Sequence, residues 1–195
     1  MNFNISNLSN PTVMLAAAVV IALLAIAVAV AVYEHKKRTA LLRSRFGPEY
    51  DLAVGAGKNS RAAEDKLVAR VKRVRNLRIL DLTEAERARF LASWETIQSR
   101  FVDHPRSAVT EADQLVNSLL QARGFPAADF EQRAADISVD HANLVAAYRS
   151  AHEITSRSDK NNATTEELRN AMLHYRALFD EFLQNQKPAE TRAVA

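Results

Sequence analysis

The chain begins with a long uncharged stretch and then alternates apolar stripes with polar faces at the spacing of α-helices. From Thr12 to Tyr33, 22 consecutive residues carry no charge, and eight of them are Ala and six are Val. A helix rises about 1.5 Å per residue, so this stretch covers about 33 Å and matches a hydrocarbon core of about 30 Å. The pattern predicts a transmembrane helix at residues 12–33.

The charges on either side of this stretch predict its orientation. Residues 1–11 contain no Lys or Arg, whereas several cations follow the stretch at once: Lys36, Lys37, Arg38, Arg43 and Arg45. The positive-inside rule makes residues 1–11 a short extracytoplasmic N-terminus and places residues 34–195 in the cytoplasm. A cleaved signal peptide is the alternative. The small residues at 27–31 favour it, whereas the uncharged N-terminus and the length of the apolar run oppose it.

Beyond the membrane segment the pattern indicates helices and turns, and it contains no convincing alternating strand. Residues 34–46 continue the membrane helix, and Gly47-Pro48 ends it. Residues 49–59 are predicted to form a loop. Residues 60–78 are predicted to form an amphipathic helix that is strongly basic.

Residues 81–185 are predicted to form a helical domain of four to five short helices. Thr83 with Glu86 and Thr164 with Glu167 match the capping-box pattern that marks a helix start. Helix ends are predicted near Pro105, at Gly124, at Ser138 to Asp140 and at Thr155 to Ala163. The fold class is therefore all-α, with one N-terminal transmembrane helix, a small helical bundle and a disordered tail at 186–195.

Apolar stripes at helical spacing predict which residues form the core of this domain. In the first helix of the domain the predicted stripe is Leu91, Trp94, Ile97 and Phe101. In the last helix the predicted stripe is Leu168, Met172, Tyr175, Phe179 and Phe182. Aromatic residues in such stripes are core residues by default, so we assign them no binding role.

Charge divides the rest of the chain into two parts of opposite sign. Residues 34–80 hold 13 Lys and Arg against 5 Asp and Glu, a net charge of +8, whereas residues 81–195 hold 13 against 18, a net charge of −5. This pattern predicts a basic juxtamembrane arm at 34–80 that carries an acidic domain. An anionic inner leaflet attracts each nearby cation by about 1 kcal/mol. A solvated helix face is an equally good interpretation, and nucleic acid is a poorer one because no groove-reading motif is present.

The cations that would contact an anionic lipid surface lie in two groups. They are Lys36, Lys37, Arg38, Arg43 and Arg45 after the membrane helix, and Lys72, Arg73 and Arg75 in the second basic helix. Small residues four apart in the membrane segment, such as Ala18 and Ala22, also offer a way for two copies to dimerise. Such pairs arise by chance in a segment so rich in Ala.

The sequence contains no recognisable catalytic or metal-binding motif. The chain has no Cys, which excludes thiolate metal sites and cysteine catalysis. Residues 55–60 resemble a phosphate-binding loop only superficially, because the Walker pattern requires a Gly where Leu52 stands and Ser or Thr where Asn59 stands. His152-Glu153 begins like a zinc-protease motif, but Ser156 replaces its second His.

One group of titratable residues remains as a candidate polar cluster: Asp136, Asp140, His141 and His152. On a continuous helix His141 and His152 would lie about 16 Å apart, too far to share a metal ion. We expect these side chains to cap helices and to pair with arginines. We therefore assign no catalytic, cofactor or metal residues, and we expect that the protein is not an enzyme.

Four further motifs are distinctive: RSRFGPEYD at 43–51, DFEQRAAD at 129–136, SVDH at 138–141 and HYRALF at 174–179. Together they resemble a family of uncharacterised bacterial proteins that carry one N-terminal membrane span and an all-helical domain. The family pattern has Pro after the Asp-His pair, where this chain has Ala142. The resemblance implies a bacterial inner-membrane setting and an intact helical domain, and it implies no activity, cofactor or partner.

The leading hypothesis is a non-enzymatic, membrane-anchored helical module that presents an interaction or scaffold surface to an unidentified protein partner. The first alternative is a surface element that responds to anionic lipid through the basic segment. The second alternative is a ligand-binding or enzymatic domain that uses the candidate polar cluster. This third class requires the four side chains to converge on one pocket.

Overall fold

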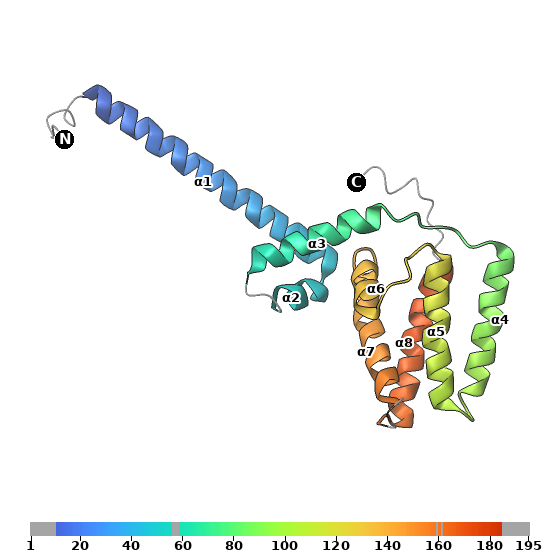
Figure 1. Ribbon diagram of the computed structural model, residues 1–195. Helices are drawn as coiled ribbons and strands as arrows, with labels where there is room; N and C mark the ends of the chain where they lie inside the picture. The colour runs from blue at the N-terminus through green and yellow to red at the C-terminus, as the bar shows by residue number, and fades with distance from the viewer. Residues whose placement is uncertain (1–10, 56–58, 159, 161, 185–195) are drawn as a thin grey trace. The chain divides into compact units, whose positions relative to one another are not determined.

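The computed structural model describes residues 11–55, 59–158, 160 and 162–184, and every regular element in them is an α-helix (Figure 1). The elements are α1 (Pro11–Phe46), α2 (Pro48–Gly55), α3 (Ser60–Arg75), α4 (Glu84–Arg100), α5 (Pro105–Ala122), α6 (Phe130–Ile137), α7 (Ala142–Ser158) and α8 (Thr165–Gln184). The all-α prediction is confirmed. The described residues form eight helices, so the count differs from the predicted four to five.

Helix α1 is long and apolar enough to cross a membrane. It has 36 residues, and the side chains from Met14 to Tyr33 are exposed. Within Met14–Phe46 a window of 18 residues reaches a mean hydropathy of 3.1, and no other helix in the described residues passes the same test of length and composition. These properties are compatible with a membrane anchor. The predictions for the N-terminus at 1–10 and the tail at 186–195 lie outside the described residues.

The chain divides into two compact units between Ser44 and Arg45. The second unit contains α2 and α3 together with the later helices. The charge pattern predicts a boundary near residue 80, between a basic arm and an acidic domain. The structure puts both sides of that position in one unit.

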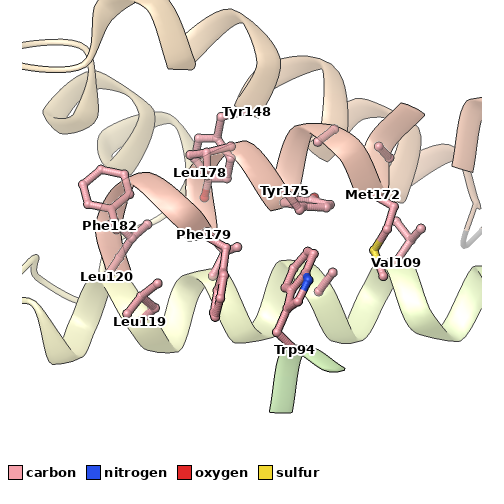
Figure 2. Close-up of a cluster of buried hydrophobic side chains, with 14 of the residues drawn as sticks. Trp94, Val109, Leu119, Leu120, Tyr148, Met172, Tyr175, Leu178, Phe179 and Phe182 are labelled. Carbon is pink, nitrogen blue, oxygen red and sulfur yellow. The ribbon is translucent and has the colours of Figure 1, made fainter. Parts of the chain in front are cut away.

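The core of the second unit lies among α4, α5, α7 and α8. Helix α8 packs against α5 and α7, and α4 packs against α5. Figure 2 shows Trp94 beside Phe179, and their rings stack with centroids 4.9 Å apart. Every residue of the stripe predicted for the last helix is buried, as the periodicity predicts.

Three local predictions need correction. Leu91 of the predicted α4 stripe is 41% exposed, and Phe90 is buried in its place. Residues 48–55 form α2 rather than a loop, since Pro48 suits a first helical position and Glu49 and Asp51 lie in the first turn. Helix α7 continues to Ser158, beyond the loop start predicted at Thr155.

The two capping boxes and the Gly124 signal are confirmed. Thr83 and Glu86 form a complete capping box, and Thr164 and Glu167 make the same reciprocal bonds at the start of α8. Gly124 follows α5 with a φ of 91°, a conformation that favours glycine.

Helices α2 and α3, with the end of α1, form a separate layer that we call the collar. Phe46, Tyr50, Leu67 and Val74 are buried in this layer and do not belong to the main core cluster. Helix α3 packs against α6, and α2 packs against α7. The collar is therefore held on α6 and α7 by its own contacts.

Candidate functional site

The contact between the collar and α6 is centred on a buried carboxylate. The Asp136 side chain is 1% exposed, and the Nε of Arg73 donates to its Oδ1 over 2.8 Å. The Nη2 of Arg73 donates to the same oxygen, and the Nε2 of Gln132 donates to it over 3.2 Å. Burial of an unpaired carboxylate destabilises the folded state by several kcal/mol. Arg73 compensates the charge of Asp136, which would otherwise oppose the packing of α3 against α6.

A second arginine binds the turn between α6 and α7. The Nε of Arg45 donates to the backbone oxygen of Val139 over 3.1 Å, and its Nη2 donates to Asp140 Oδ1 over 3.1 Å. A cation placed after the C-terminus of α6 also interacts favourably with the helix dipole. The end of α1 is thereby tied to this turn.

A third pair joins α2 to α7. The buried Glu49 accepts a bond from Arg149 Nη2 over 3.0 Å, and Arg70 Nη1 of α3 lies 3.6 Å from the same oxygen. Arg149 Nη1 also donates to Glu131 over 2.7 Å. Burial lowers the pKa of Arg149, but the bonds to Glu131 and Glu49 outweigh this effect and raise the pKa overall.

We call the pairs Arg45–Asp140, Arg73–Asp136 and Arg149–Glu49 the clasp. Each pair joins the collar to α6, α7 or the turn between them. The clasp brings predicted lipid-surface cations together with members of the candidate polar cluster. A single sequence carries no signal for this pairing, because the partners of Arg45 and Arg73 are 95 and 63 residues away.

A cleft lies beside α6 and α7. It has a volume of about 650 Å³ and is lined by Asp129, Phe130, Glu131, Arg149, His152, Glu153 and Ser156. The rings of Phe130 and His152 stack with centroids 3.7 Å apart and an interplanar angle of 9°. His152 Nδ1 lies 3.8 Å from Asp113 Oδ1, so a protonated imidazole would face a carboxylate.

A buried polar network surrounds Asp113. The hydroxyl of Tyr175 donates to Asp113 Oδ1 over 3.0 Å, and the amide of Asn117 donates to Oδ2 over 3.1 Å. Tyr148 donates to Asn117 in turn. Burial raises the pKa of Tyr148 and of Tyr175, and the Asp113 charge raises the pKa of Tyr175 further. Both phenols therefore stay protonated near neutral pH and act as donors.

The structure does not bring the candidate polar cluster together. Asp136 pairs with Arg73, and Asp140 pairs with Arg45. His141 Nδ1 lies 3.0 Å from Glu181, and His152 lies against Phe130 and Asp113. The four side chains thus have four different sets of partners. Within the described ranges no group of three or more His, Asp or Glu could hold a metal ion.

The predicted lipid-surface cations fall into three structural classes. Arg45 and Arg73 belong to the clasp, and Lys72 and Arg75 are exposed on α3. The others lie on α1: Lys36, Lys37, Arg38 and Arg43. The superficial phosphate-loop motif falls partly on residues 56–58, which lie outside the described residues.

Comparisons with known proteins do not relate this chain to any of them. No protein family, no curated protein and no solved structure matches the chain.

Proposed function

We propose that this chain is a single-pass membrane protein that presents a non-enzymatic helical interaction module to the cytoplasm of a bacterial cell. The observation that carries the proposal is α1, which has the length and hydropathy of a transmembrane helix and exposed apolar side chains. Exposed apolar side chains in such number are costly in water and favourable in lipid.

The orientation rests on the charges that follow the apolar stretch. Lys36, Lys37 and Arg38 come within five residues of Tyr33. Such clusters keep their side of a helix in the cytoplasm. The inner membrane of a bacterium is the setting that the motif resemblance implies.

An interaction module fits the second unit better than a catalytic one does. Three members of the candidate polar cluster, Asp136, Asp140 and His141, each pair with a separate partner. Large apolar side chains are exposed on separate helices, among them Leu91 on α4 and Leu173 on α8. Such residues contribute to docking surfaces when a partner covers them.

Membrane orientation is the first test. The chain has no Cys, so a Val102→Cys variant places one thiol at a residue that is 82% exposed. We expect a membrane-impermeant maleimide to label it only after cell lysis, and we expect alkaline carbonate to leave the protein in the membrane. Ser158→Cys is the matched control, because Ser158 is 3% exposed and its thiol should react only after unfolding. Labelling of Val102→Cys in intact cells would contradict the proposed orientation.

Partner binding is tested by photo-crosslinking in living cells. A photoreactive amino acid placed at Leu91 or Leu173 should give a discrete adduct from at least one position. The same amino acid at the buried Leu178 should give none. Absence of an adduct from every exposed position would argue against an interaction module.

A further inference from the structure

Helix α3 combines a basic surface with an apolar side that the protein itself covers. Its 16 residues contain six cations, which are Arg61, Lys66, Arg70, Lys72, Arg73 and Arg75, against Glu64 and Asp65, so its net charge is +4. Leu67 is fully buried and Val74 is 2% exposed. A basic amphipathic helix of this kind is also the kind of element that lies in the interface of an anionic membrane.

Ion pairs contribute to the contact between the collar and the bundle. The buried side chains of α3 lie outside the main core cluster, and Arg73 holds α3 against α6 through Asp136. The side chain of Arg73 is still 41% exposed, although its partner is almost fully buried. An anionic surface can therefore approach the arginine and compete with the carboxylate for it.

The lengths of the elements allow α3 to reach a bilayer once it is released. The charged end of α1, residues 34–46, extends about 20 Å beyond the apolar stretch at about 1.5 Å per residue. The 16 residues of α3 span about 24 Å by the same rise. This step rests on the proposed function, because it requires α1 to lie in a membrane.

We propose that α3 exchanges between two partners, its own domain and the anionic lipid surface of the membrane that holds α1. In the docked state Arg73 pairs with Asp136 and the apolar side of α3 lies against the protein. In the released state the same apolar side enters the membrane interface, and the cations of α3 contact anionic headgroups. The clasp is then a switch that responds to the lipid composition of the membrane.

In the released state, lipid contacts of the same chemistry replace two contacts of the docked state, the apolar contact of α3 and the carboxylate at Arg73. The interface of a bilayer accepts the apolar side of α3 to a depth of about 5–10 Å. Anionic headgroups replace the carboxylate at Arg73, and they also engage the exposed Lys66 and Lys72. The neutral headgroups of a zwitterionic bilayer supply no such replacement, so the docked state should persist there.

Hydrogen exchange of the full chain in lipid nanodiscs tests this proposal. One set of discs contains phosphatidylcholine alone, and the other contains phosphatidylglycerol as well. Release of the collar uncovers α6, so we expect the amides of residues 134–139 to exchange at least about tenfold faster in the anionic discs. The amides of α5 and α8, which lie in the main core, should exchange equally in both sets.

Two variants separate the clasp from the lipid contact. Asp136→Asn removes the charge that retains Arg73, so release should occur at a lower fraction of phosphatidylglycerol. Its control is Glu166→Gln on α8. This substitution alters an ion pair with Arg169 in which the Glu166 side chain is 68% exposed. Lys72→Glu keeps the clasp and weakens the lipid contact, so release of α3 should need more phosphatidylglycerol. Its control, Lys160→Glu in the turn between α7 and α8, should behave as the unaltered chain does.

Equal exchange of residues 134–139 in both sets of discs at low salt would overturn the proposal. The same acceleration in neutral discs with inorganic phosphate would overturn its assignment to a bilayer surface. Incorporation into the discs is measured separately. A chain that does not enter either kind of disc refutes the membrane anchor, whereas a chain that enters both and shows no difference in exchange refutes the lipid switch alone.

Discussion

Single glycines show how strongly one backbone position can constrain this fold. A Cβ on Gly124 would lie 2.2 Å from the backbone oxygen of Arg78, and the φ of Gly124 is 91°. The backbone before α4 therefore lies close against the loop after α5. The Leu80 amide also donates to the backbone oxygen of Arg123 over 3.0 Å. No flexible side chain is available to move away, so the backbone itself would have to shift.

Gly124→Ala should therefore lower the free energy of unfolding by about 3 kcal/mol or more, since steric strain adds to the cost of a left-handed conformation. Gly47→Ala should cost only about 1–2 kcal/mol, because Gly47 has a positive φ but open space around it. Gly55→Ala meets neither constraint and should change stability by less than about 0.5 kcal/mol. Denaturant unfolding of the detergent-solubilised chain, followed by the fluorescence of Trp94, gives all three values. Equal values for Gly124→Ala and Gly47→Ala would contradict the close contact with Arg78.

The buried carboxylate of Asp136 gives a second prediction at the scale of a residue. Arg73→Gln removes the cation that compensates it, and we expect a loss of about 3 kcal/mol, the low end for a broken buried pair because Arg73 is partly exposed. Arg169→Gln breaks a pair whose two side chains are more than 60% exposed, so it should cost at most about 0.5 kcal/mol. The same unfolding measurement compares them, and equal losses would show that Asp136 does not depend on Arg73.

The start of α8 makes the stability of one helix depend on pH. Glu167 has a pKa of about 2, lowered first by the backbone amide of Thr164 and then by Arg157 and the Thr164 hydroxyl. A carboxyl whose pKa is lower in the folded state stabilises that state fully above its ordinary value near 4.5. This stabilisation is lost as the pH falls from there toward about 2.

Glu167→Gln removes the charge and keeps the shape of the side chain. We expect the variant to be less stable than the unaltered chain at pH 6 and to approach it in stability as the pH falls below about 4.5. Thermal unfolding at a series of pH values measures the difference. A gap that stays constant from pH 6 to pH 3 would show that the bonds of this capping box do not depend on the carboxylate charge.

Most elements could be predicted from local signals, and the exceptions have physical causes. Capping residues and Gly124 act within one turn of the chain, so the sequence alone locates those helix ends. The α4 stripe was ambiguous, because Phe90 and Leu91 both lie at helical spacing from Trp94, and tertiary packing selects Phe90. Local signals at Pro48, Glu49 and Asp51 support α2, whereas the burial of Glu49 and Tyr50 depends on Arg149 and Glu64, which no local pattern identifies.

The orientation of the whole molecule should depend on a few charges in α1 that directly follow its apolar stretch. Replacing Lys36, Lys37 and Arg38 by Gln removes the positive charge closest to the apolar stretch. We expect part of the population to insert with the second unit outside, because charges within about 15–20 residues of a span dominate its orientation. Labelling of Val102→Cys in intact cells measures that fraction.

Charge removal on the bundle provides the matched control. Replacing Arg89, Arg100 and Arg169 by Gln removes the same number of charges from exposed positions far from the span. This variant should keep the original orientation. If it inverts as readily as the first variant does, net charge rather than the flanking cluster sets the topology.

The sequence does not predict which distant charged residues pair with one another. The composition shows that residues 34–80 are basic and residues 81–195 are acidic. This pattern indicates a basic arm and a separate acidic domain. The structure puts the two halves in direct contact through Arg45 with Asp140 and Arg73 with Asp136. Periodicity reports which face of a helix is apolar, and it contains no information about which distant charge lies opposite.

The ion pairs described above share one further property: their cations are arginines or histidines. Acylation of the lysines would therefore leave every one of these pairs in place. Residues 34–80 contain five lysines, so the same reaction would reduce their net charge from +8 to +3. Acylation of lysines would therefore lower the positive charge of residues 34–80 without breaking these ion pairs.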